Sequence, residues 1–94
     1  MACVSPFSAG GEAEVLVRAN DTNLGLVGGV LSNDGGRCWR VADALRVGTV
    51  FVNTWNKTDA AAPFGGFGGS GMGRDLGVEA MFEYTQSKNV VWEY

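Results

Sequence analysis

A helix-forming segment between two strand-forming segments constrains the fold of this chain more than any other feature. Residues 24–31 (LGLVGGVL) are apolar on both alternating faces, which is typical of a strand covered on both sides. Residues 49–53 (TVFVN) are rich in β-branched and aromatic side chains and also favour a strand. Between them, apolar residues recur at helical spacing, at Cys38, Val41, Ala42 and Leu45. This succession predicts two parallel strands joined by a crossover helix.

Two further elements are predicted before this unit. Residues 4–7 form a short apolar stretch, which Pro6 confines to the end or the edge of a strand. A helix begins at Glu12, because apolar residues then recur on one helical face. It ends at residues 20–21 (ND), which favour turns over helix interiors.

The second half of the chain predicts a loop, a helix and a strand. Asp34 is a good N-cap for the middle helix, and Gly48 lies where a C′ glycine would end it. Residues 54–73 are rich in glycine and have no periodicity, which usually indicates a functional loop. Residues 78–85 predict a third helix, and residues 90–92 predict a closing strand. The order predicts an α/β fold with a parallel βαβαβ-type unit and right-handed crossovers, followed by the loop, a helix and a terminal strand.

The composition excludes several classes of protein. The net charge is −3 and the basic residues are scattered, so no basic stripe is available for nucleic acid. No apolar run approaches the ~20 residues of a membrane span, and residues 1–7 lack the features of a signal peptide. Two isolated cysteines, Cys3 and Cys38, are typical of a reducing compartment, which predicts a cytoplasmic or mitochondrial protein. Histidine is absent, so we expect no metal site and no self-contained hydrolase.

Residues 66–71 (GFGGSG) satisfy the string G-x-G-x-x-G of dinucleotide-binding folds. In those folds the string follows its strand almost at once and opens a helix, whereas here the preceding predicted strand ends at Asn53. The alternative is a loop whose glycines let the backbone take positive φ and lie close to another surface. We expect no cofactor to be bound by this chain alone. Neither Cys3 nor Cys38 is expected to be a nucleophile, because no histidine can activate the thiol, and Cys38 is expected in the core.

Three aromatic residues of the loop and the arginine that follows it are candidates for a site. Trp55 and Phe64 follow the carboxyl end of the second predicted strand, where ligands of parallel α/β sheets bind. Buried packing is the alternative for both, as it is for Phe67. Arg74 is placed at the opening of the last helix, where the macrodipole disfavours a cation. We expect its guanidinium to be held by a carboxylate or by loop carbonyls.

Several short blocks of the sequence form a recognisable series. They are residues 19–22 (ANDT), 25–26 (GL), 44–45 (AL), 48–53 (GTVFVN), 63–66 (PFGG), 70–71 (SG), 73–74 (GR), 84–85 (YT) and Lys88. In this order and at this spacing they resemble the C-terminal end of the aldehyde dehydrogenase superfamily. The sequence departs from the family at Gly68, where a lysine is usual, and at Leu24, where an aromatic residue is common. Gly68 is expected to loosen the loop further.

One subfamily resembles the chain most. Residues 51–54 (FVNT), 56–59 (NKTD), 61–67 (AAPFGGF) and 93–94 (EY) are similar to the 10-formyltetrahydrofolate dehydrogenases. Those enzymes prefer NADP and carry the formyl group of folate to carbon dioxide, a step of one-carbon metabolism. The resemblance implies an NAD(P)-dependent oxidoreductase that converts an aldehyde or formyl group to acid or carbon dioxide.

The family mechanism uses a cysteine thiolate, a glutamate base, an asparagine in an oxyanion hole and a nicotinamide held on a Rossmann domain. All of these lie upstream of the matched region, so the resemblance implies that this chain has no catalytic residue and is inactive alone. It also implies three groups of functional residues. Those lining the substrate funnel are Trp55, Lys57, Thr58 and Phe64. Those supporting the site are Asn53, Gly65, Gly66 and Arg74. Those in contact with a neighbouring subunit are Lys88, Val90, Val91 and Trp92.

The resemblance also divides the chain. Residues 1–86 are expected to be the late part of a catalytic domain, and residues 87–94 the terminal strand of an oligomerisation sheet. The expected partner is the remainder of an aldehyde dehydrogenase chain or a homologous subunit, within a homo-oligomer. NADP or NAD is expected in the complete enzyme only. The alternative is a stand-alone non-catalytic module that binds a full-length aldehyde dehydrogenase through its terminal strand.

Overall fold

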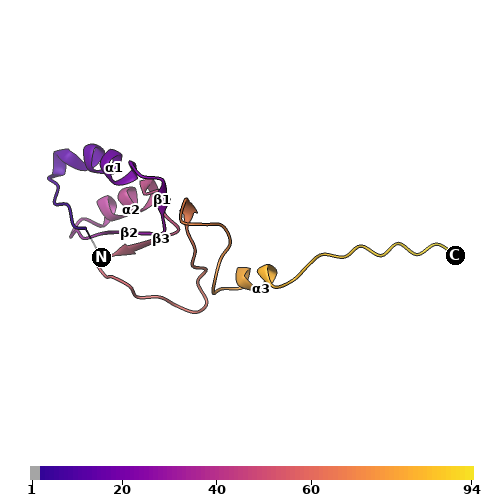
Figure 1. Ribbon diagram of the computed structural model, residues 1–94. Helices are drawn as coiled ribbons and strands as arrows, with labels where there is room; N and C mark the ends of the chain where they lie inside the picture. Colours follow the sequence, from indigo (N-terminus) through magenta and orange to yellow (C-terminus); the bar gives the residue numbers. More distant parts are fainter. Residues whose placement is uncertain (1–2) are drawn as a thin grey trace.

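The computed structural model describes residues 3–94, without the side chain of Ala9, and shows a packed unit followed by a long extended segment (Figure 1). The radius of gyration is 17.9 Å and the chain measures 70 × 27 × 25 Å along its principal axes. A compact chain of this size would have a radius of gyration near 13 Å, roughly. Much of the chain therefore lies outside the packed unit. The first two residues of the expected 1–86 segment lie outside the described residues.

A parallel βαβ unit forms the centre of the packed part. Strands β2 (Val27–Val30) and β3 (Thr49–Val52) pair in parallel, with Gly29 opposite Phe51. Helix α2 (Gly35–Ala44) connects them and packs against both strands. This confirms the predicted strand pair and its crossover helix.

The start of α2 is as predicted, and its end is not. Asp34 Oδ1 accepts a hydrogen bond of 3.0 Å from the backbone N–H of Arg37, which satisfies one of the free donors at the helix N-terminus. The helix ends at Ala44 and Leu45 is already extended, so Gly48 is not its C′ residue. A Cβ at Gly48 would instead collide with the carbonyl oxygen of Gly65. The glycine is needed for the close approach of the later loop, a contact that local sequence does not reveal.

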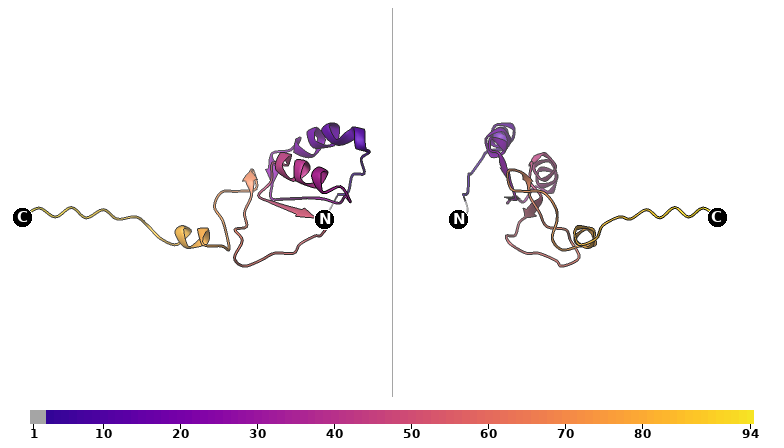
Figure 2. Two further views of the ribbon diagram at one scale, coloured as in Figure 1. Left: turned by 180° about the vertical axis from the view of Figure 1, so that it is seen from behind. Right: turned by 45° about the vertical axis from the view of Figure 1, so that its right-hand side comes forward.

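Helix α1 (Glu12–Asn20) follows the short 3-10 helix η1 (Ala9–Gly11) and confirms the predicted first helix. It packs against α2, on the side of the sheet that α2 covers (Figure 2). Glu12 joins the two helices, because its carboxylate accepts hydrogen bonds of 2.9 and 3.0 Å from Arg40. The core beneath them consists of Val30, Cys38 and Val41, with Phe7, Leu16 and Leu45 packed against it. The prediction that Cys38 is a core residue is confirmed.

The predicted strand at residues 24–31 is two strands in two different sheets. Strand β1 (Leu24–Gly25) pairs antiparallel with β4 (Phe67–Gly68), and the chain bends at Leu26 before β2 begins. The split arises because the returning loop supplies a partner for the first two residues, while β3 supplies one for the rest. The predicted strand at residues 4–7 is absent from the described chain; Pro6 lacks an N–H there, and Phe7 packs on the core instead. The described residues therefore contain one βαβ unit, not a βαβαβ unit.

The C-terminal part of the chain leaves the packed unit. Helix α3 (Glu79–Glu83) confirms the existence of the third predicted helix, but it has a single turn and no buried residue. Residues 85–94 have no regular secondary structure, and Figures 1 and 2 show them as a single trace pointing away from the rest. The predicted closing strand at residues 90–92 is thus not formed within the described chain. A strand requires a neighbouring strand, and these residues have none beside them.

Candidate functional site

Trp55, at the start of the glycine-rich loop, packs on the face of the β2–β3 sheet opposite the helices. Gly29 and Phe51 are partners in the parallel register and point to this face. The rings of Phe51 and Trp55 lie with their centroids 5.3 Å apart at an interplanar angle of 59°. Phe51 is only 5% exposed, whereas Trp55 is 55% exposed. One side of the Trp55 indole therefore packs on the sheet, and much of the rest is exposed.

Asn53 directs the chain as it leaves β3. Its backbone is in the left-handed region (φ 52°), which asparagine tolerates better than most residues. Its side-chain amide makes two hydrogen bonds with the backbone of Ser32: Oδ1 accepts from the N–H at 2.9 Å, and Nδ2 donates to the carbonyl at 3.0 Å. The loop that leads into α2 is thereby held to the end of β3.

The loop closes on itself through a short backbone pairing. Phe64 and Asp75 form an antiparallel bridge with two N–H···O hydrogen bonds of 2.7 Å. Gly65 follows directly, and a Cβ there would lie 2.5 Å from the carbonyl oxygen of Gly73 and 2.7 Å from Arg74. A side chain at position 65 is therefore excluded by the packing of the loop.

Arg74 is held by loop carbonyls, one of the two acceptors expected for it. Its Nη1 donates to the carbonyl oxygens of Gly66, at 3.1 Å, and Gly73, at 2.6 Å. The guanidinium carbon lies 5.5 Å from the centroid of the Phe67 ring, within the range of a cation–π interaction. Arg74 is not at the opening of a helix, since α3 begins only at Glu79. Its guanidinium connects two parts of the loop, at Gly66 and at Gly73.

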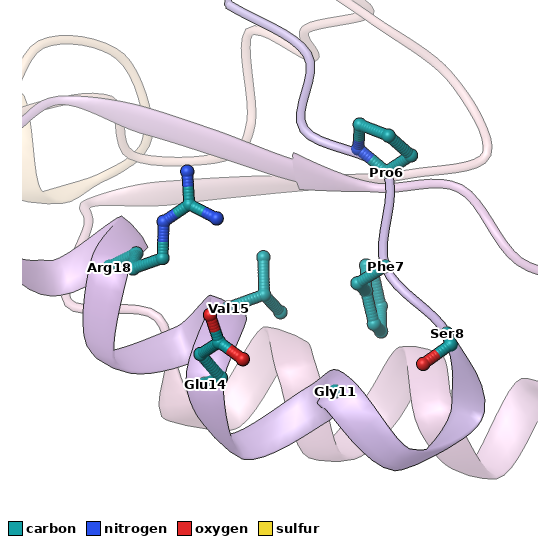
Figure 3. A pocket seen from close by; sticks show the side chains of 7 residues that line it. All are labelled: Pro6, Phe7, Ser8, Gly11, Glu14, Val15 and Arg18. Carbon is teal, nitrogen blue, oxygen red and sulfur yellow. The ribbon is translucent and has the colours of Figure 1, made fainter.

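The four expected funnel residues, Trp55, Lys57, Thr58 and Phe64, are absent from the lining of the two hollows described below. Lys57 and Thr58 are exposed, and the chain then turns at Asp59, whose carbonyl accepts from Ala62 N–H at 3.0 Å. Two hollows lie elsewhere. One, of about 140 Å³, is lined by Pro6, Phe7, Ser8, Gly11, Glu14, Val15 and Arg18, with Val15 between Arg18 and Phe7 (Figure 3). The other, of about 260 Å³, is lined by Asn20, Thr22, Asn23, Leu24, Arg46, Phe67, Gly68 and Gly69. The sequence predicted neither hollow. The first is formed within residues 6–18, and the second brings together residues 20–24, Arg46 and residues 67–69.

The glycine string at residues 66–71 does not have the geometry of a dinucleotide site. Strand β4 lies inside the string, and α3 begins eight residues after Gly71. The backbone at Gly68 is left-handed (φ 55°), and a Cβ there would lie 2.7 Å from the carbonyl oxygen of Asn23. The loop interpretation fits these residues and a dinucleotide fingerprint does not. Within residues 3–94, no group of three metal-ligating side chains occurs. In the same part of the chain, no helix is long and apolar enough to cross a membrane.

The acidic groups with altered pKa values lie at the two helices, away from Trp55. The pKa of Glu12 is lowered, chiefly by its hydrogen bond with Arg40. Asp34 also has a lowered pKa, chiefly because its carboxylate accepts the N–H of Arg37 at the start of α2. Both shifts follow from contacts that favour the ionised form. These charges fix the helices and do not point to acid–base chemistry at the loop.

Comparison with known proteins identifies the family. The aldehyde dehydrogenase family model matches residues 1–90. The chain belongs to the aldehyde dehydrogenase family. Cytosolic 10-formyltetrahydrofolate dehydrogenase of Xenopus tropicalis is 54% identical over 91 residues, and the human protein is 53% identical. In both cases the match covers 97% of this chain and 10% of the relative, so the chain spans about a tenth of the length of these relatives.

Solved aldehyde dehydrogenases have the same fold over most of the chain. The structure of a betaine aldehyde dehydrogenase from Staphylococcus aureus matches with a TM-score of 0.79 and 47% identity, over 82% of this chain and 15% of that one. The indole-3-acetaldehyde dehydrogenase of P. syringae, in complex with NAD+ and IAA, matches with a TM-score of 0.77 and 41% identity, over 80% and 15%. The predicted resemblance is thereby confirmed.

In this aldehyde dehydrogenase chain, family blocks that are distant in sequence contact one another. Asn20 Nδ2 donates to the carbonyl of Ala44 at 2.9 Å, and its Oδ1 accepts from Arg46 N–H at 2.9 Å. The N–H of Gly25 donates to Ser70 Oγ at 2.9 Å. The two side-chain hydrogen bonds of Asn20 connect the end of α1 with the end of α2, and the hydrogen bond of Ser70 connects the loop with β1. These family blocks therefore supply contacts between the elements of the packed unit.

Proposed function

We propose that this chain is the C-terminal part of the catalytic domain of an NAD(P)-dependent aldehyde dehydrogenase. The observation that carries the proposal is the 54% identity over 97% of the chain to a tenth of a 10-formyltetrahydrofolate dehydrogenase. The chain would contribute to the oxidation of an aldehyde or formyl group to acid or carbon dioxide in the cytosol or mitochondria, as part of one-carbon metabolism. Its own residues would shape the substrate funnel and the contact with a neighbouring subunit.

The funnel role is proposed for Trp55, Lys57, Thr58 and Phe64. Trp55 supports it best, because it follows the carboxyl end of β3, near which ligands of such sheets bind, and more than half of its surface is exposed. Asn53, Gly65, Gly66 and Arg74 would hold these residues in place through the contacts described above. In the isolated chain the funnel is open, so we propose that the remainder of the enzyme supplies its other wall.

The subunit-contact role is proposed for residues 87–94, with Lys88, Val90, Val91 and Trp92 as the contact residues. The side chains of Val91 and Trp92 are 84% and 80% exposed, although both are apolar. Backbone and side chains of this segment are free to add a strand to another sheet, which is the usual fate of exposed apolar strand-forming segments. A homo-oligomer of the complete enzyme would bury them.

The proposal implies that the 94-residue chain oxidises no aldehyde and binds neither NAD nor NADP by itself. Its glycine string does not fit a dinucleotide, and the resemblance places the nucleophile upstream. The indole-3-acetaldehyde dehydrogenase that it resembles is described in complex with NAD+, which supports NAD(P) use by a complete enzyme.

Complementation tests the proposal directly. A human 10-formyltetrahydrofolate dehydrogenase lacking the 91 residues that match this chain would be co-expressed with the chain. We expect NADP-dependent aldehyde oxidation from the purified mixture and none from either part. Matched co-expression with a Trp55→Ala chain would show whether any restored activity depends on the proposed funnel residue.

The stand-alone binding module makes the opposite prediction in the same assay. Such a module would bind the intact dehydrogenase, restore nothing to the truncated one and leave substrate selectivity unchanged. Binding of that kind, measured by co-purification, would overturn the enzyme-part proposal.

A further inference from the structure

We propose that Gly29 and Asn53 are positioning residues for Trp55, and so set the shape of the substrate-lining wall. Gly29 leaves room beneath the indole, and Asn53 sets the direction in which the chain leaves β3. The geometric part of this inference stands on contacts within the chain. Its consequence for substrate choice rests on the function proposed above.

The indole of Trp55 lies directly over Gly29. A Cβ built at Gly29 would lie 3.1 Å from Cζ3 and 3.3 Å from Cε3 of Trp55, and 3.2 Å from the carbonyl oxygen of Phe51. Side-chain carbons rarely come so close to their neighbours, so the ring can rest on the strand only because position 29 has no side chain. Gly28, the preceding residue, faces the other side of the sheet, where its Cβ would meet Leu45 and Val47. The two adjacent glycines therefore serve different faces.

Asn53 fixes the turn that brings Trp55 back over Gly29. Its backbone N–H continues the β2–β3 pairing by donating to Val30 at 2.9 Å, and its side-chain amide continues it further through Ser32. Both the amide donor and the amide acceptor are used, so a carboxylate cannot replace it: Asp has no N–H for the Ser32 carbonyl. Glycine would accept the left-handed backbone but would lose both side-chain bonds. The position thus requires a left-handed residue with one donor and one acceptor.

The fluorescence of Trp55 measures its position in the chain itself. Trp39 and Trp92 are both about four-fifths exposed, so Trp39→Phe and Trp92→Phe should leave Trp55 as the only indole at little cost to stability. In this background we expect Gly29→Ala and Asn53→Asp to shift the Trp55 emission to longer wavelength and to increase its quenching by iodide. Gly28→Ala is the matched control, since it adds the same methyl group on the opposite face, and it should leave both readings unchanged.

A double-mutant cycle keeps the test valid if a variant is destabilised. Gly29→Val should destabilise the chain when Trp55 is present and much less in the Trp55→Ala background, because the removed indole leaves space for the valine. Equal destabilisation in the two backgrounds, together with unchanged Trp55 fluorescence in Gly29→Ala, would overturn the proposal. Asn53→Gly keeps the backbone conformation. If the side-chain hydrogen bonds position the turn, its Trp55 emission and iodide quenching should resemble those of Asn53→Asp.

Substrate selectivity separates this inference from the proposed function. In the complete enzyme, Gly29→Ala should change the ratio of kcat/KM for a small and a bulky aldehyde by about tenfold, as one methylene in a substrate pocket does, and Gly28→Ala should not. If the fluorescence responds and the selectivity does not, Trp55 is positioned as inferred but does not line the funnel. If Trp55→Ala alters selectivity while Gly29 and Trp55 show no coupling, the funnel role stands and the positioning role is wrong.

Discussion

Residues 12–53 and residues 54–94 differ in how many of their apolar side chains are buried within the chain. The buried hydrophobic side chains of the described chain, Val30, Cys38, Val41 and Phe51, all lie in the first region. The second region exposes a series of large apolar side chains: Trp55, Phe67, Met72, Leu76, Val78, Met81, Phe82, Tyr84, Val90, Val91, Trp92 and Tyr94. A soluble surface rarely gathers so many, and such surfaces commonly mark contacts with other proteins.

Residues 12–53 bury their core through contacts among themselves, whereas most of residues 54–94 do not. In the first region, a cap, two helices and one parallel pair bury a small core within about forty residues of chain, which is near the lower limit for a unit that folds alone. In the second region, contacts with the first are made by the loop, for example at Gly65 and Trp55. Beyond α3, stability must come from a surface outside this chain, in keeping with the proposed place of the chain in a larger enzyme.

The same substitution in the two regions should have very different costs. Phe51→Ala removes a buried ring and should cost about 3–5 kcal/mol, which is comparable with the whole stability of so small a unit. Phe82→Ala removes a ring that is 71% exposed and should change stability by about 0.5 kcal/mol or less. Urea unfolding followed by circular dichroism measures both. Equal losses would show that α3 is packed in solution and would break the comparison.

Self-association should depend on the second region alone. We expect the isolated chain to sediment as oligomers or aggregates, because Val90, Val91 and Trp92 can pair with another chain. Val91→Lys should shift it towards monomer with helix content kept. Val17→Lys, the same change at an exposed valine of α1, is the matched control and should not. A wild-type chain that is monodisperse and folds cooperatively would contradict this prediction.

Replacing one aspartate should lower the stability of the chain if the residue lies in the first region, and should leave it unchanged if the residue lies in the second. Asp34→Ala deprives α2 of its N-cap, so the urea midpoint should fall. Asp59→Ala removes a comparable bond, from Ala61 N–H to Asp59 Oδ1 at 2.8 Å, but only within an exposed turn of the loop. Its midpoint should stay at the wild-type value, and a fall as large as that of Asp34→Ala would show that the loop is coupled to the core.

The smallest expected effect is a loss of stability in acid. The pKa values of Glu12 and Asp34 are lowered in the folded chain from their ordinary values of 4.5 and 3.8. Their stabilising contribution is therefore complete above those values and is lost as the pH falls through the lowered ones. Urea midpoints measured between neutral pH and pH 3, roughly, should decline, and Glu12→Gln should decline less steeply. An identical slope for the variant would remove Glu12 from the explanation.

The sequence by itself determined the local elements and the family. The middle helix with its Asp34 cap, the strand pair around it and the first helix all follow from spacing and capping within a few residues. The resemblance also predicted Asn53 as a supporting residue and Trp55 as a funnel residue, and both roles stay predictions. These signals are readable because each depends on residues close together in the chain, where periodicity and hydrogen-bonding side chains act directly.

Only the tertiary structure decided which distant segments meet. Asn53 binds Ser32 across 21 positions, Gly48 makes room for Gly65, and the indole of Trp55 rests on Gly29. Likewise, residues 24–31 form two strands because two different partners reach them. Residues 90–92 form no strand, because no partner within residues 3–94 reaches them. Strand pairing and the close approach of two backbones are properties of both segments together. A glycine or a valine run records the capacity for such a contact, and the neighbour in space determines whether the contact exists.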